Sequence, residues 1–257
     1  MRFGIISDIH GNLVALRAVL DALNARGIDR LICLGDIVGY GPDPEACLDL
    51  VAEYNATTIV GNHEEALCCP EIAARFNDHA RVAIEWTRAR LITNRPDLMR
   101  VVADLPGMAY FGSTIMCVHD TPAPGSPSYL LDGYGAARAF AGVDVPICFV
   151  GHTHVPVAFR REHNLQRSDS VPNRPIETIR PENMMEVDID SQTQWIINPG
   201  SVGQPRDGDV RASCLILDLE EAHFEWMRVE YDVAEAQQRA EAAGLPTESV
   251  RRLAIGA

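Results

Sequence analysis

Short apolar runs alternate with amphipathic segments from the beginning of the chain. Residues 2–7 form an apolar run that predicts a β-strand, and residues 12–26 carry four leucines at the spacing of one helical face. Next come a predicted strand at 31–34 and a predicted helix from Asp43 to about Tyr54, with Asp43 as N-cap and proline at the first helical position. A strand at 57–60 follows this helix. This β-α-β-α-β order predicts a parallel sheet with right-handed crossovers.

The rest of the chain is richer in strands. After a long helical stretch at 71–91, apolar runs predict strands at 108–111, 114–118, 146–150, 155–159, 195–198, 212–218 and 223–231, with antiparallel pairing. Residues 161–194 are polar and contain three prolines, which predicts an extended hairpin or flap. Residues 233–254 are expected to form two C-terminal helices that break near Gly244. Without internal repeats or a clear linker, we expect one domain over residues 1–257.

Composition narrows the class of protein. The 257 residues include 36 Asp plus Glu against 22 Lys plus Arg, a formal net charge of −14, which disfavours binding to nucleic acid. The absence of an apolar run of about 18 residues argues against a membrane span, and the first residues do not resemble a signal peptide. The seven cysteines form no CxxC pair, and adjacent Cys68 and Cys69 are expected to be reduced thiols, so we expect a cytoplasmic protein.

Candidate metal ligands follow five of the predicted strands. They are Asp8 with His10, Asp36, Asn62, His119, and His152 with His154. Because the carboxyl ends of strands meet at one edge of an open α/β sheet, these side chains are expected to converge. Two carboxylates, one amide oxygen and four imidazoles without a thiolate suit Mn, Fe, Zn, Ni or Co. Seven ligands are too many for one catalytic ion and fit two ions that share a carboxylate.

These residues also occur in ordered motifs. D-x-H at 8–10, G-D-x-x-G at 35–39, G-N-H-E at 61–64, then His119 and G-H-x-H at 151–154 together resemble the signature of the calcineurin-like metallophosphoesterase superfamily. Residues 198–207, NPGSVGQPRD, are similar to a further motif of its YfcE-like bacterial phosphodiesterase branch. The resemblance implies an α/β, four-layer sandwich in which two mixed β-sheets pack face to face and are flanked by helices.

The resemblance further implies a role for each residue. Asp8, His10 and His154 would hold the first metal ion, Asn62, His119 and His152 the second, and Asp36 would bridge them. His63 would contact the phosphoryl oxygens or protonate the leaving alkoxide. A hydroxide that bridges the ions would attack phosphorus in line, and manganese is the favoured metal ahead of Fe, Zn, Ni or Co.

Several polar residues near the motifs have two interpretations. Glu64 either accepts an imidazole N–H from a ligand or is a carboxylate at a helix N-terminus. Arg206 either faces the phosphate or pairs with a neighbouring acid, Asp207 or Asp209. The remaining histidines, His79, His163 and His223, have no partners at a suggestive spacing and are expected to be surface or core residues.

Together these features predict a dinuclear metal-dependent phosphoester hydrolase, with a phosphodiesterase of small or nucleotide-like substrates favoured. A phosphoprotein phosphatase, a diadenosine-polyphosphate hydrolase and a non-catalytic scaffold are the alternatives. The net charge does not exclude an anionic substrate, because two divalent ions bring about +4, and two carboxylates and a hydroxide leave roughly +1 at the reacting centre. The charge instead disfavours long polyanions, while no pattern predicts the oligomeric state.

Overall fold

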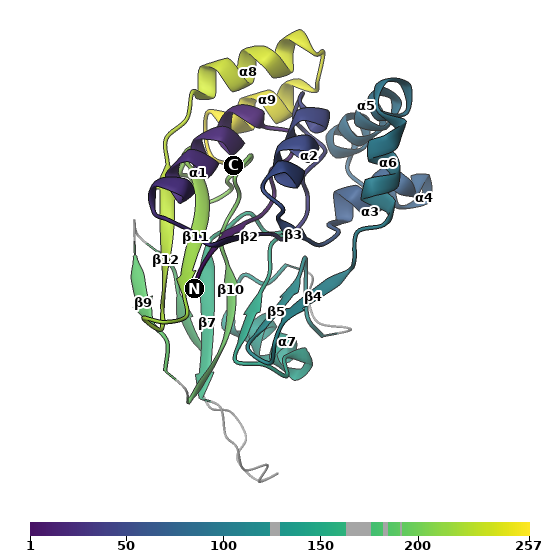
Figure 1. The fold of residues 1–257 in the computed structure, drawn as a ribbon. Helices are drawn as coiled ribbons and strands as arrows, with labels where there is room; N and C mark the ends of the chain where they lie inside the picture. The colour runs from purple at the N-terminus through teal and green to yellow at the C-terminus, as the bar shows by residue number, and fades with distance from the viewer. Residues whose placement is uncertain (124–128, 163–175, 182–184, 191) are drawn as a thin grey trace.

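The computed structural model describes residues 1–123, 129–162, 176–181, 185–190 and 192–257, and its strands form two mixed six-stranded sheets (Figure 1). The first sheet has the order β3 (Thr57–Thr58), β2 (Arg30–Cys33), β1 (Arg2–Ile6), β11 (Ala212–Asp218), β12 (His223–Val229) and β9 (Glu186–Asp188). The second has the order β4 (Met108–Phe111), β5 (Ile115–Val118), β6 (Ile147–Phe149), β10 (Thr193–Asn198), β7 (Val157–Glu162) and β8 (Glu177–Ile179).

Strand direction follows the sequence pattern. Strands β1, β2 and β3 run parallel, as the β-α-β-α-β order predicts, and β11 and β12 extend this sheet with antiparallel pairs. In the second sheet β5, β6 and β10 run parallel, while β4, β7 and β8 pair in the antiparallel direction. The carboxyl ends of the parallel strands of each sheet therefore share one edge.

Helices cover the outer faces of both sheets. The apolar cluster outside the first sheet includes residues of α1 (Leu13–Ala25), α2 (Pro44–Glu53), α3 (Asn62–Cys68), α4 (Pro70–Ala73), α5 (Asp78–Asn94) and α6 (Pro96–Ala103). The second sheet packs against α7 (Gly133–Ala139) and the short 3₁₀ helix Phe140–Gly142. The C-terminal helices α8 (Val233–Ala242) and α9 (Thr247–Leu253) lie beside α1 from the other end of the chain (Figure 1).

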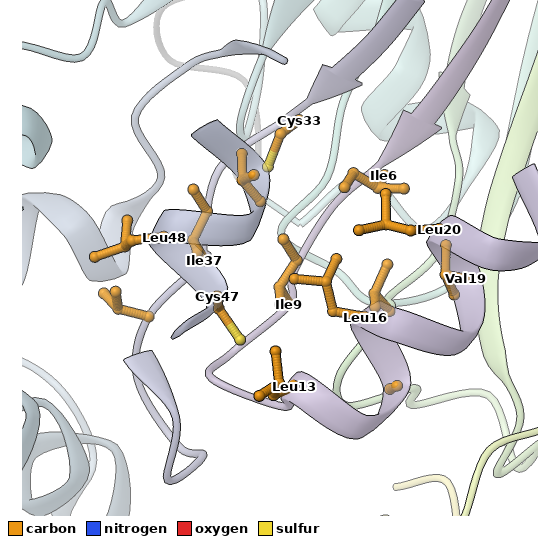
Figure 2. Close-up of a cluster of buried hydrophobic side chains, with 14 of the residues drawn as sticks. Ile6, Ile9, Leu13, Leu16, Val19, Leu20, Cys33, Ile37, Cys47 and Leu48 are labelled. Atoms are coloured by element: carbon orange, nitrogen blue, oxygen red, sulfur yellow. The ribbon is translucent and has the colours of Figure 1, made fainter. Parts of the chain in front are cut away.

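The core explains why the strands are continuous apolar runs. In β1, Phe3 and Ile5 lie between the two sheets, whereas Ile6 packs against the helices. Figure 2 shows Leu16 and Leu20 of α1 with Ile6 in this outer cluster. Both faces of the sheet are buried, so residues of both orientations are apolar. The structure is thus the predicted four-layer sandwich of helices, two sheets and helices.

Two helix predictions differ from the structure. The stretch predicted as one helix at 71–91 is interrupted, because α4 ends at Ala73 and the Asn77 side chain caps α5 by accepting a hydrogen bond from the Ala80 amide at 3.0 Å. Helix α2 begins at Pro44 with Asp43 at the N-cap position, as predicted, but the Asp43 side chain makes no capping hydrogen bond. The Asp43 carboxylate instead accepts two hydrogen bonds from Arg239 of α8, at 2.9 and 2.6 Å.

The range predicted as a hairpin or flap contributes strands to both sheets. Strand β7 pairs with β8 in the second sheet, whereas β9 pairs with β12 in the first. Residues 163–175, 182–184 and 191 of this range lie outside the described residues, and so does His163. Helices α3, α6 and α7 were not predicted from the sequence. Helices α8 and α9 agree with the prediction for residues 233–254.

Candidate metal centre

The strand-end loops adopt an unusual backbone conformation. Six of their residues have a left-handed φ: Asp8 (55°), His10 (50°), Asp36 (53°), Tyr40 (54°), His152 (67°) and His154 (60°). Only two other non-glycine residues of the described chain share it. Each such residue costs roughly 1–3 kcal/mol, and this strain persists where surrounding contacts hold it. Here the amides of Asp8 and His10 donate to the carbonyl oxygens of Gly35 and Asp36, at 3.1 and 2.9 Å.

These loops bring four predicted ligands into a first group. Donor atoms of Asp8, His10, Asp36 and His154 all lie within 4.8 Å of one another, and all four side chains are buried. The Nε2 atoms of His10 and His154 are 3.0 Å apart. Asp8 Oδ1 lies 3.4 Å from His154 Nε2, and Asp36 Oδ2 lies 3.7 Å from His10 Nε2.

The other predicted ligands form a second group around the same aspartate. Donor atoms of Asp36, His119 and His152 lie within 4.8 Å of one another. Asn62 Oδ1 lies 3.1 Å from His119 Nε2 and 2.8 Å from His152 Nδ1. Because Asp36 belongs to both groups, the seven residues predicted from strand ends form two adjacent donor sets with a shared carboxylate.

Backbone carbonyl groups fix the orientation of three imidazoles. The Nδ1 atoms of His10, His119 and His154 lie 3.0, 2.7 and 2.6 Å from the carbonyl oxygens of Val38, Leu34 and Gln204. A carbonyl oxygen only accepts, so each Nδ1 carries a proton. In His10 and His154, whose rings are neutral, the Nε2 lone pair therefore faces the cluster. This is the arrangement in which histidine binds a metal ion.

Two features of the first group fit a cation. The facing Nε2 atoms of His10 and His154 would be two hydrogen-bond acceptors 3.0 Å apart, which repel unless a positive charge lies between them. Asp8 Oδ1 is buried without a hydrogen-bond partner in the described structure. A buried carboxylate oxygen in this state is costly unless it is paired or coordinates a metal ion. The donor set therefore fits a metal centre.

Burial keeps most of the imidazoles neutral. It lowers the pKa of His10 and His154 well below the usual value, and that of His63 and His152 to about 4. Neutral rings do not have to lose a proton before they bind a metal ion.

The two aspartates differ in their surroundings. Burial raises the pKa of Asp8 to about 7. Burial also acts to raise the pKa of Asp36, but the imidazoles of His119, His63 and His10 together outweigh it, and the pKa of Asp36 is well below its usual value. In turn, burial acts to lower the pKa of His119, but the charge and hydrogen bond of Asp36, together with Asp8 and the Leu34 carbonyl, outweigh burial and raise this pKa to about 10. Asp36 and His119 thus form a charge pair at the second group, with Nε2 3.3 Å from Oδ2.

Glu64 is a carboxylate at a helix N-terminus, the second of its two predicted roles, and it also binds backbone amides of the Asp36 loop. Its carboxylate accepts a hydrogen bond at 2.9 Å from the amide of Gly61, the N-cap of α3, rather than from an imidazole of the described chain. It also accepts from the amides of Asp36, Ile37 and Val38, at 2.7, 2.8 and 3.0 Å. Burial raises its pKa to about 7. Glu64 therefore ties the loop that carries the shared Asp36 to the start of α3.

Two motif glycines allow close approach around Asp36 and His63. A Cβ atom on Gly61 would lie 2.2 Å from Asp36 Oδ1, and one on Gly39 would lie 2.2 Å from His63 Nδ1. Gly39 in addition has a φ of +87°. Since Nδ1 of His63 lies against Gly39, Nε2 is the ring nitrogen available to the open side of the cluster.

A cavity of about 260 Å³ opens next to the donor groups. Its lining includes Asp36, Asn62, His63, His152 and His154, which the sequence motifs identify. It also includes Tyr40, Arg75, Phe76, Tyr129 and Arg206, of which only Arg206 was a candidate. Tyr40 follows the motif at 35–39, whereas Arg75, Phe76 and Tyr129 follow no strand of the predicted pattern, so the sequence carries no signal that places these three here.

The alternative pairing considered for Arg206 is wrong. Asp207 pairs with Arg228, and Asp209 pairs with Arg211 at 2.6 Å. The Arg206 guanidinium donates to Gln204 Oε1 at 3.0 Å and lies over the Tyr40 ring, 5.8 Å from its centroid. Arg206 is therefore positioned at the cavity, and no acid within the described residues forms an ion pair with it.

The remaining histidines and cysteines lie outside the donor groups. His79 is half-buried, with its ring centroid 6.3 Å from that of Tyr40, and His223 lies 3.4 Å from Glu186. All seven cysteines are free thiols. Within the described residues, no helix has both the length and the apolar character needed to cross a bilayer.

The fold, the order of the candidate ligands along the chain and the geometry of the site are together typical of metal-dependent hydrolases. A comparison with protein-family models identifies the same class. The model of the calcineurin-like phosphoesterase superfamily domain matches residues 1–222, so the chain belongs to this superfamily and is a phosphoesterase with a metal-binding site.

Known relatives span the whole chain. An uncharacterized protein of Methanocaldococcus jannaschii is 35% identical over 256 residues, which are 98% of this chain and 97% of that protein. The crystal structure of a metallophosphoesterase from Sphaerobacter thermophilus is similar with a TM-score of 0.83 and 38% identity, over 100% of this chain and 99% of that one. A hypothetical protein of Pyrococcus horikoshii shares the fold, with a TM-score of 0.74, 19% identity and coverage of 100% and 98%.

Proposed function

We propose that the protein is a dinuclear metal-dependent phosphodiesterase that hydrolyses small or nucleotide-like substrates. The observation that supports this function is the pair of donor groups that share Asp36 and border a cavity. Two ions bound to one bridging carboxylate are typical of hydrolases that displace a leaving group from phosphorus. Manganese is the favoured metal, and the mixed oxygen and nitrogen donors also suit Fe, Zn, Ni and Co.

Each residue then has a defined part in holding the metals. Asp8, His10 and His154 would bind the first ion, Asn62, His119 and His152 the second, and Asp36 both. When bound, the ions would lower the pKa of a water molecule and neutralise charge on the phosphoryl group. The carbonyl oxygens that accept from the Nδ1 atoms keep the rings in the ligating orientation before metal arrives.

His63 and Arg206 would act on the substrate itself. In the hydrolysis, a water oxygen bonds to phosphorus, the bond from phosphorus to the leaving oxygen breaks, and a proton ends on the leaving alcohol. His63 Nε2 is available to donate to a phosphoryl or leaving oxygen, because its Nδ1 is packed against Gly39. The Arg206 guanidinium would bind a non-bridging oxygen, since no acid of the described chain neutralises it.

Cavity size favours a small substrate. At about 260 Å³ the cavity is below the range of roughly 300–1,000 Å³ that is typical of sites for drug-sized ligands. A phosphoprotein phosphatase would need a longer groove, so this alternative is less well supported. The products of hydrolysis would distinguish a diadenosine-polyphosphate hydrolase from the proposed phosphodiesterase. A non-catalytic scaffold would hydrolyse no ester.

A substrate panel tests the proposal. Purified protein is loaded with Mn²⁺, Ni²⁺, Zn²⁺ or Co²⁺, assayed on phosphate mono-, di- and pyrophosphate esters, and analysed for metal content. We expect hydrolysis of activated diesters and about two ions per chain. Asp36→Asn should lower both the metal content and kcat/KM, the latter by about 100-fold or more. Asp21→Asn, on the exposed face of α1, is the matched control and should change neither.

Two outcomes would contradict the function. Equal rates in Asp36→Asn and the parent would refute the shared-carboxylate mechanism. Metal-loaded protein that is inert toward every ester of the panel would instead support a non-catalytic scaffold.

A further inference from the structure

Two aromatic side chains line the cavity beside the metal-facing residues. Phe76 comes from the connection between α4 and α5, and its ring centroid lies 4.9 Å from that of His63. Tyr129 comes from the segment before α7, and its ring centroid lies 4.4 Å from that of His152. Two aromatic rings therefore lie next to the position at which the donor groups would hold a phosphorus atom.

The two rings differ in how firmly the fold holds them. Phe76 is half-buried and packs against the apolar clusters of α5 and the C-terminal helices. Tyr129 is 50% exposed, and in the described structure its ring contact is with His152 alone. An exposed aromatic ring against a candidate metal ligand offers a flat apolar face that a planar group of a ligand can cover.

Two arginine side chains add positive charge to the cavity beside these aromatic rings. Arg75 and Arg206 line the cavity, and Arg206 keeps its guanidinium at the cavity through Gln204 and Tyr40. In a chain with a net charge of −14, the cavity thus combines cations with aromatic faces. Cationic groups recognise phosphate oxygens, and aromatic faces stack on aromatic rings, so the combination suits a phosphate ester with an aromatic substituent.

We propose that Tyr129 and Phe76 select phosphate esters in which one substituent is a planar aromatic group, such as an aryl ring or a nucleobase. This inference rests on the proposed function, because the donor groups must hold the phosphorus for the substituent to reach these rings. Tyr129 is the more discriminating of the two, since its exposed face is available without rearrangement of the core. Stacking of one base on an aromatic side chain changes affinity by roughly 5- to 150-fold.

Binding of phosphonates tests the selection without any turnover, because the carbon–phosphorus bond is not hydrolysed. Protein loaded with Mn²⁺ is titrated calorimetrically with phenyl-, cyclohexyl- and methylphosphonate. We expect phenylphosphonate to bind about tenfold more tightly than methylphosphonate and several-fold more tightly than cyclohexylphosphonate. The cyclohexyl compound matches the size and apolar character of phenyl without its aromatic face, so it separates stacking from simple burial.

Four variants assign the preference to the proposed residues. Tyr129→Leu and Phe76→Leu should each reduce the ratio of phenylphosphonate to methylphosphonate affinity, to about twofold for Tyr129→Leu. Tyr129→Phe keeps the ring and should keep the preference. Tyr134→Leu is the control, because Tyr134 is 76% exposed on the neighbouring α7 and does not line the cavity.

The results separate this inference from the proposed function. Equal affinities of the parent protein for the three phosphonates would overturn the selection, and so would a preference that survives in both leucine variants. Hydrolysis of diesters without any preference for aromatic substituents would overturn the selection and leave the proposed function intact. Failure to hydrolyse any ester, with selective phenylphosphonate binding preserved, would overturn the function and leave the aromatic site.

Discussion

Replacing Glu64 with glutamine is expected to destabilise the protein strongly, although the two side chains have nearly the same shape. Glu64 is fully buried, and its two oxygens accept four backbone N–H groups from two separate segments. Gln keeps one acceptor oxygen and turns an NH₂ group toward the other two amides. Two charge-assisted hydrogen bonds are then lost, and the two buried backbone N–H groups that made them face the NH₂ group of the glutamine, which is also a donor.

The size of the effect follows from those contacts. A hydrogen bond to a charged group contributes about 1.5–3 kcal/mol, so the loss of two amounts to about 3–6 kcal/mol. The desolvation that raises the pKa of Glu64 offsets part of this contribution in the parent. The loss is a large share of the 5–15 kcal/mol by which typical proteins are stable. For a chain of this length it corresponds to a fall of roughly 10 °C in Tm. Because Glu64 also fixes the Asp36 loop, metal affinity should fall by about 10- to 100-fold.

Urea and thermal unfolding of metal-free Glu64→Gln measure the first effect, and calorimetric titration with Mn²⁺ measures the second. The experiment is done near pH 8.5, above the pKa of about 7 at Glu64, so that the parent carboxylate is ionised. Glu65→Gln is the control, because Glu65 is the exposed neighbour on α3 and should change stability by less than about 0.5 kcal/mol. If Glu64→Gln unfolds and binds metal like Glu65→Gln, the loop-tying role of Glu64 is refuted.

Three further changes test other parts of the structure. Gly39→Ala should abolish hydrolysis and destabilise the fold, because the added Cβ would lie 2.2 Å from His63 Nδ1. Gly208→Ala is the control, since Gly208 has a similar φ of +85° and nothing within 4 Å; it should cost only about 1 kcal/mol and keep activity, and equal effects of the two variants in urea unfolding and kinetic assays would contradict this. Arg239→Gln should lower the free energy of unfolding by about 1–2 kcal/mol through loss of the Asp43 pair, with exposed Arg251→Gln as the near-neutral comparison. A hydrogen bond from Arg2 lowers the pKa of Asp218 to about 2, so Asp218 stabilises the fold above about pH 4, and this contribution disappears as the pH falls toward 2. Asp218→Asn should therefore be about 1 kcal/mol less stable than the parent at pH 7 and equal to it near pH 2. A difference in stability that does not change with pH would show that ionisation is not the cause.

Strand-end residues were predictable because two local rules act together. Alternation of apolar runs with amphipathic helices identifies parallel strands, and parallel strands present their carboxyl ends at one edge. The seven candidate ligands could therefore be grouped although Asp8 and His154 are 146 positions apart in the sequence. The interrupted helix at 71–91 was not predictable to the same degree, because both segments have helical character and only the cap at Asn77 separates them.

Local rules failed where two distant segments compete for one side chain. Asp43 stands at a helix N-cap before a proline, yet Arg239 of α8 takes its carboxylate. Glu64 has the spacing of a capping residue, but the loop of Asp36 adds three amides that no helix pattern includes. In both cases a long-range hydrogen bond to a charged group adds to or replaces the local one.

The family resemblance carried by the motifs was enough to predict the layered α/β fold, and residue type and spacing along the chain predicted the order of the candidate ligands and the chemistry of the donor set. Only the tertiary structure shows which imidazole nitrogen faces the cluster, that no acid of the described chain pairs with Arg206, and that Phe76 and Tyr129 line the cavity. These features depend on atoms from loops that are distant in sequence, and their positions are fixed only when the two sheets pack and the strained backbone at the strand ends is held in place.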